Sequence, residues 1–103
     1  MTKTAVRAVL LILLASAAFA TPEADNLAQQ GAHAYWNKKY DLAFKHFKKA
    51  CELGNGDGCA YLGMAYEEGI SVKKEREKAV SFYQKACKLG SKQSCENYKK
   101  LQK

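Results

Sequence analysis

From Cys51 to Cys59 the sequence reads Cys-Glu-Leu-Gly-Asn-Gly-Asp-Gly-Cys, and the pattern returns thirty-six positions later, from Cys87 to Cys95, as Cys-Lys-Leu-Gly-Ser-Lys-Gln-Ser-Cys. The same offset holds upstream of the cysteines, where it aligns Ala43 with Ala79, Phe47 with Tyr83, Lys49 with Lys85 and Ala50 with Ala86. Self-similarity at a fixed period is the sequence signature of stacked supersecondary units. The chain therefore predicts a repeat architecture.

The first twenty residues have the layout of a secretory signal peptide. Lys3 and Arg7 precede an apolar run that starts at Ala8, and Ala18-Phe19-Ala20 has small residues where signal peptidase requires them. The run from Ala8 to Ala20 is 13 residues long, short of the ~20 apolar residues that span a bilayer. We expect residues 1–20 to be removed and the protein to be exported, to the periplasm or beyond the cell, with an uncleaved anchor as the alternative.

Length and charge restrict what the remaining chain can be. The 103 residues include 17 Lys and Arg against 10 Asp and Glu, and removal of Lys3 and Arg7 lowers the net charge from +7 to +5. A chain of this size allows one domain, so a large multi-domain enzyme and a membrane transporter are excluded. Export also excludes a cytosolic nucleotide-binding protein. An 83-residue exported domain has a modest core and often needs covalent staples.

Helical periodicity and helix-end signals run through residues 21–103. Thr21 and Pro22 form a typical helix start, and Gly54, Gly69 and Gly90 stand where left-handed terminators are expected. We expect helices over about 21–37, 41–52, 58–68, 75–88 and 94–101, with Asp57 capping the third. No stretch alternates with period two for long enough to predict a strand. The expected fold class is all-α, a short α/α solenoid of antiparallel helix pairs.

The spacing of small and aromatic residues resembles a known repeat. Gly31, Ala43, Phe47 and Ala50 have the spacing of a tetratricopeptide repeat. A second series follows at Leu62, Gly63, Tyr66, Ala79, Tyr83 and Ala86, lengthened by four residues in the loop 68–74. A unit lengthened there is similar to a Sel-one-like repeat, and the added cysteine spacing resembles the secreted Helicobacter cysteine-rich proteins. The resemblance implies a first unit over about 21–56, a second over 57–92 and a C-terminal capping helix over 93–103.

The four cysteines are expected to be structural. They allow three disulfide connectivities, and only Cys51–Cys59 with Cys87–Cys95 gives every unit the same local bridge. A four-cysteine zinc site is the alternative, but such sites usually place cysteines two to four residues apart within each pair. The C-x-x-C motif of redox enzymes is absent as well. We therefore predict one disulfide per repeat, no metal and no cofactor.

A partner-binding groove follows from the resemblance. In tetratricopeptide-like solenoids the ligand-binding surface comes from the first helix of each unit. Carried over from Gly31 and Gly63, that surface comprises Ala28, Ala32, Tyr35, Ala60, Met64 and Glu67, with Glu96 and Lys100 from the last helix. These residues would suit an extended peptide. The alternative is that two units give too little concavity to bind anything alone, because solenoid surfaces normally extend over several repeats.

Catalytic candidates are weak by comparison. Ser71-Val72-Lys73-Lys74 matches the S-x-x-K motif of penicillin-recognising serine enzymes, but its S-D-N and K-T-G partner motifs are missing from residues 21–103. His33 and His46 are the only histidines and form no evident nucleophile–base pair; we expect His46 at a solvated rim, while His33 could face a groove. The resemblance nevertheless implies β-lactam binding or weak β-lactamase activity, through residues that the sequence does not identify.

The leading functional prediction is thus an exported protein- or peptide-binding module. Lysines such as Lys45 and Lys48 alternate with acids in the pattern of solvated helix faces, so no nucleic acid partner is expected, and no membrane span remains after cleavage. The alternatives are a β-lactamase-like enzyme with a cell-wall or β-lactam-type ligand, and an accessory fragment that completes its stack as a homodimer.

Overall fold

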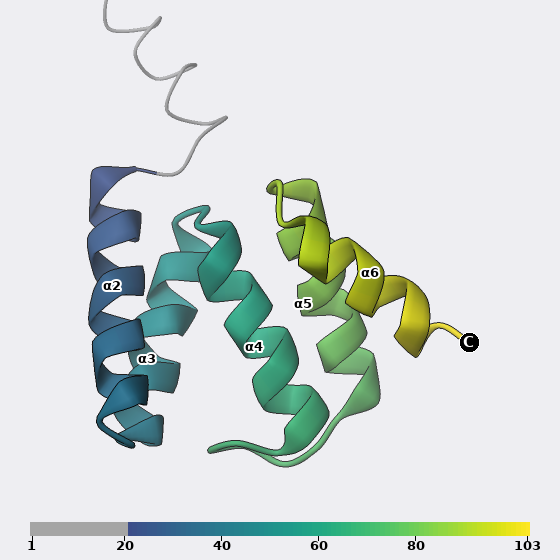
Figure 1. The fold of residues 1–103 in the computed structure, drawn as a ribbon, viewed down its shortest axis with the longest axis horizontal. Coiled ribbons are helices and arrows are strands. Elements are labelled where there is room, and N and C mark those ends of the chain that lie inside the picture. Colours follow the sequence, from purple (N-terminus) through teal and green to yellow (C-terminus); the bar gives the residue numbers. More distant parts are fainter. Residues whose placement is uncertain (1–20) are drawn as a thin grey trace, which may run out of the picture.

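Residues 21–103 are described by a computed structural model, so the expected signal peptide at residues 1–20 lies outside the described residues. The described part is all-α, as the sequence predicts. Its helices are α2 (Pro22–Trp36), α3 (Tyr40–Glu52), α4 (Gly56–Glu68), α5 (Arg76–Lys88) and α6 (Lys92–Leu101). Each helix packs antiparallel against the next one along the chain, and α2 also touches α4 (Figure 1). None of these helices is both long and apolar enough to cross a membrane.

Most helix ends follow the signals in the sequence. The Thr21 hydroxyl accepts a hydrogen bond from the backbone N–H of Ala24 at 3.1 Å and caps α2. Gly54, Gly69 and Gly90 have φ values of 94°, 77° and 105°, in the left-handed region that glycine adopts without a steric penalty. These glycines end α3, α4 and α5, as expected.

The starts of α4 and α6 differ from the prediction. Asn55, rather than Asp57, caps α4, because its side-chain oxygen accepts a hydrogen bond from the Gly58 N–H at 2.8 Å. The helix accordingly begins at Gly56, and Asp57 lies in its first turn. Ser91, thirty-six positions after Asn55, caps α6 in the same way, so that helix begins at Lys92 rather than near residue 94.

Both disulfides have the expected pairing. Cys51–Cys59 joins the end of α3 to the first turn of α4, with 4.6 Å between the Cα atoms. Cys87–Cys95 joins α5 to α6 in the same way, with a Cα separation of 4.7 Å. No cysteine of residues 21–103 is left as a thiol, so in this structure none is free to act as a zinc ligand. Each bridge therefore ties the second helix of one pair to the first helix of the next.

Helix pairing depends on small residues at the contact. A Cβ atom on Gly31 would lie 2.9 Å from a ring carbon of Phe47, and one on Gly63 would lie 2.7 Å from a ring carbon of Tyr83. Only glycine leaves room for the aromatic ring of the partner helix at such distances. Ala43, Ala50, Ala79 and Ala86 are fully buried as well. In this way α2 packs closely on α3 and α4 on α5, and α2 also contacts α4.

Candidate functional site

Two neighbouring cavities lie along the surface formed by α2, α4 and α6, and Asp57 lines both of them. The first has a volume of about 410 Å³ and is lined by Asp25, Ala28, Gln29, Ala32, Phe47, Asn55 and Asp57. The second has a volume of about 460 Å³ and is lined by Asp57, Ala60, Tyr61, Met64, Glu67, Glu68, Tyr83, Ser91, Gln93, Ser94 and Asn97. We call the two cavities together the inner groove.

Five of the eight residues predicted for the groove line it. Ala28 and Ala32 line the first cavity, and Ala60, Met64 and Glu67 line the second.

The other three predicted residues lie elsewhere. Tyr35 is half-buried and contacts Tyr61 edge-to-face, with 5.7 Å between ring centroids. Glu96 and Lys100 are exposed on α6 and line neither cavity. Instead α6 presents Gln93, Ser94 and Asn97 to the groove.

Hydrogen bonds fix two carboxylates of the groove. The Asn55 side-chain amide donates to the Asp25 carboxylate at 2.9 Å, while its oxygen caps α4. The Tyr83 hydroxyl donates to the Glu67 carboxylate at 2.7 Å. Burial, and then this hydrogen bond to Glu67, raise the pKa of Tyr83. The phenol therefore stays protonated and keeps donating at neutral pH.

Tyr61 lies between the groove and the core. Its ring stacks on Phe47 at a centroid distance of 4.4 Å and an interplanar angle of 25°, and only 7% of its surface is exposed. Burial, together with the nearby Tyr35, Tyr40 and Asp41, raises its pKa to about 12. The hydroxyl is buried without a hydrogen-bond partner among the described residues.

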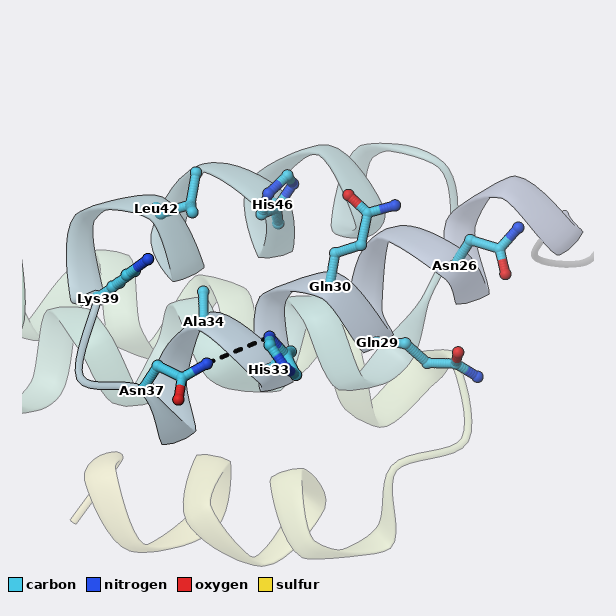
Figure 2. Close-up of a pocket in the computed structure, with 9 residues that line it drawn as sticks. All are labelled: Asn26, Gln29, Gln30, His33, Ala34, Asn37, Lys39, Leu42 and His46. Carbon is cyan, nitrogen blue, oxygen red and sulfur yellow. Dashed lines mark hydrogen bonds between the residues drawn. The ribbon is translucent and has the colours of Figure 1, made fainter.

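A separate pocket of about 530 Å³ lies between α2 and α3 (Figure 2). Its lining is rich in amide and imidazole side chains: Asn26, Gln29, Gln30, His33, Ala34, Asn37, Lys39, Leu42 and His46. His33 is exposed, and its Nδ1 lies 3.3 Å from the Asn37 side-chain nitrogen. His46, half-buried on α3, belongs to the same pocket. Both histidines therefore lie outside the inner groove.

The S-x-x-K match falls on an exposed loop. Ser71 lies between α4 and α5, is exposed, and has a φ of 66°. Glu75 anchors the loop through a hydrogen bond from its N–H to the Tyr66 carbonyl at 2.9 Å, and Ile70 and Val72 pack against the core. These contacts give the loop a structural role. Within residues 21–103, no group of three or more His, Cys, Asp or Glu is arranged to hold a metal ion.

Sequence reasoning missed several groove residues. Asp25 and Glu68 look like ordinary helix-surface acids, and Tyr83 looks like a core residue of the second helix in its unit. Asn55 and Ser91, however, carried a readable signal, because residues with good capping side chains stand at equivalent positions of the two units. Aligning the helix-capping positions of the two units, as well as their core positions, would have predicted the role of both residues.

Comparison with known proteins agrees with the geometry. The model of the Sel1 repeat matches residues 29–55 and 56–91. Beta-lactamase HcpA of Helicobacter pylori strain J99 is 43% identical over 63 residues, which cover 61% of this chain and 25% of that protein. HcpC of H. pylori strain 26695, whose name marks its β-lactamase assignment as provisional, is 43% identical over 44 residues, or 43% of this chain and 15% of HcpC. The matches thus span a quarter or less of these relatives. With its two matched repeats, the chain belongs to the Sel1 repeat family.

Proposed function

We propose that this protein is an exported binding module that holds an extended peptide, or an extended segment of a partner protein, in its inner groove. The observation that carries the proposal is the pair of adjoining cavities across α2, α4 and α6, joined at Asp57. Small side chains such as Ala32 and Ala60 line these cavities, and they leave space for a peptide backbone. A Sel1 repeat is a protein-interaction unit, and solenoids of this kind bind partners along extended surfaces.

Export is the second part of the proposal. Two disulfides in an 83-residue chain are characteristic of proteins that fold in an oxidising compartment. They support export. Removal of residues 1–20 would then leave a single domain over 21–103, with units at about 21–56 and 57–92 and a capping helix at 93–103. The periplasm or the extracellular space would keep both bridges oxidised.

Peptide display against the oxidised protein tests the proposal. Ala32→Gln combined with Ala60→Gln narrows both cavities with neutral side chains. We expect this variant to bind the selected peptides at least tenfold more weakly than the unaltered protein. Ser81→Gln on α5 is the matched control, since Ser81 is exposed and lines neither cavity. If display selects no peptide, or if selected peptides bind the groove variant as tightly as the unaltered protein, the proposal is wrong.

β-Lactam binding or hydrolysis is a second candidate, favoured by the name of the relative HcpA. The cysteines of this chain offer no thiolate for it, because all four are in disulfides. A chromogenic cephalosporin assay on the oxidised protein is the direct test. Turnover that Ser71→Ala abolishes and Ser81→Ala preserves would establish a serine mechanism. Turnover that survives both substitutions would place the chemistry at another site, while absence of turnover would remove hydrolysis from consideration.

A further inference from the structure

The inner groove has the opposite charge to the rest of the described chain. Residues 21–103 carry 15 Lys and Arg against 10 Asp and Glu. Yet every charged residue that lines the two cavities is acidic: Asp25, Asp57, Glu67 and Glu68. The helices α2 and α4 contain no lysine or arginine at all, whereas α3 and α5 carry three and four of them. The basic side chains therefore lie on α3, α5, α6, the connecting segments and the C-terminus, and none lies on α2 or α4.

No lysine or arginine of residues 21–103 forms an ion pair with a groove carboxylate. Among residues 21–103, the ion pair that forms joins Lys78 to Glu75, at 3.6 Å, and neither residue lines a groove cavity. The groove residues from α6 are uncharged, namely Gln93, Ser94 and Asn97. A concave surface lined by unneutralised charges of one sign focuses their field and raises the local concentration of counter-charged ligands.

Two of the four groove carboxylates are also held in place. Asp25 accepts a hydrogen bond from Asn55, and Glu67 accepts one from Tyr83. A carboxylate has about four acceptor positions, so each retains sites for a ligand cation. Fixing the carboxylate in advance lowers the entropy lost when a ligand binds. Between these acids lie Ala28, Ala32, Ala60 and Met64, which are apolar surfaces suited to the methylene stems of long basic side chains.

We propose that the inner groove selects extended peptides whose side chains carry lysine or arginine. This inference rests on the proposed function and gives its partner a chemical class. A nucleic acid or another polyanion would be repelled by the same four carboxylates. The ligand is a segment of another protein, and a basic segment of a second copy of this chain is the competing occupant that the experiment distinguishes.

The test compares three eight-residue peptides that differ only at two positions, occupied by Lys, Gln or Glu. An extended octapeptide is ~26 Å long, enough to cross two helix spacings of ~9 Å. Binding to the oxidised protein is measured by calorimetry at low and high salt. We expect the Lys peptide to bind at least tenfold more tightly than the Gln peptide and the Glu peptide to bind most weakly. Added salt should narrow the differences, because it screens exposed charges.

Charge-neutral variants assign the preference to the groove. Asp57→Asn with Glu68→Gln removes two exposed groove charges, and we expect the preference for Lys over Gln to fall about tenfold. Glu52→Gln with Glu77→Gln removes two charges from α3 and α5 and should leave the preference unchanged. Circular dichroism of each variant verifies that the helices are retained.

Each remaining outcome is decisive. Equal binding of the three peptides would overturn the charge preference and leave the proposed function standing. Failure of all three, and of every display-selected peptide, would contradict the proposed function itself. Light scattering on the protein alone is the third arm: a dimer that Asp57→Asn with Glu68→Gln dissociates would show that a second copy occupies the groove, and the proposal of a separate partner would be wrong.

Discussion

The two disulfides close loops of the same length but should contribute unequally to stability. In the chain-entropy model, a bridge across eight positions stabilises the folded state by about 2.5 kcal/mol. This contribution is equal for the two bridges. The packing differs, because Cys51 and Cys59 are 1% and 0% exposed, whereas Cys87 and Cys95 are half-buried.

Replacing each pair by alanine separates the two contributions. Deleting two fully buried sulfur atoms adds about 1 kcal/mol per atom for lost burial and the cavity left behind. Replacing the first bridge should therefore lower the free energy of unfolding by about 4 to 5 kcal/mol, and replacing the second should lower it by about 2.5 to 3 kcal/mol. By joining α3 to α4, the first bridge also connects the two complete helix pairs. The second bridge attaches only the ten-residue helix α6 to α5.

Urea unfolding followed by circular dichroism gives both free energies, and calorimetry gives the melting temperatures. For a domain of this size, 1 kcal/mol corresponds to about 4 to 8 °C. The two losses differ by at least about 1 kcal/mol, so we expect the Cys51→Ala, Cys59→Ala protein to melt at least ~4 °C below the Cys87→Ala, Cys95→Ala protein. Equal losses would refute the argument that burial distinguishes the bridges, and a larger loss at the second bridge would reverse the order of stability along the solenoid.

Three further predictions concern single residues. Gly63→Ala should destabilise the protein by about 1 to 2 kcal/mol, measured by urea unfolding, because overpacking against the ring of Tyr83 outweighs the gain in helix propensity. Gly56→Ala is the control: its Cβ would be no closer than 3.4 Å to its neighbours, and it should cost less than about 0.5 kcal/mol. Tyr83→Phe should cost about 1 kcal/mol through the lost hydrogen bond to a carboxylate, whereas Tyr61→Phe should be neutral or stabilising because it removes an unpaired buried hydroxyl; similar losses in both variants would contradict this assignment. Alkaline pH should destabilise the fold, because the pKa of Tyr61 in the folded protein, about 12, exceeds its ordinary value of 10.0. The stability that depends on the neutral phenol is therefore complete below pH 10.0 and is lost as the pH rises through about 12. An absorbance titration should show this step in the native protein and not in Tyr61→Phe, and its persistence in the variant would disprove the assignment.

The sequence predicted the fold closely because the repeat gives each signal twice. Gly54 and Gly90 end α3 and α5 at equivalent positions, and the Cys51–Cys59 pairing follows from the same symmetry. The start of α4 was misplaced because Asn55-Gly56 reads as a turn. The Asn55 side chain decides this position, because it caps the helix. Gly58 serves close helix contact rather than a turn, since a Cβ there would lie 2.8 Å from the Phe47 carbonyl oxygen.

The groove was harder to predict because it depends on contacts between units. Ala28 and Ala60 follow from the resemblance to the repeat family. The acidic lining does not, since the net charge of +5 for residues 21–103 points the other way and only the packing shows which charges lie together. Likewise, the contact of Tyr83 with Glu67 joins residues 16 positions apart on different helices, and no local pattern encodes it.

The central claim is that the inner groove binds an extended peptide, and an NMR titration of the oxidised protein with the Lys-containing octapeptide tests it most directly. Backbone amide shifts report which surface the peptide touches. We predict the largest shifts along one line on α2 and α4, at Ala28, Ala32, Ala60 and Met64, which line the two cavities. Shifts confined to α3 and α5, or none at a peptide concentration that saturates binding by calorimetry, would contradict the claim.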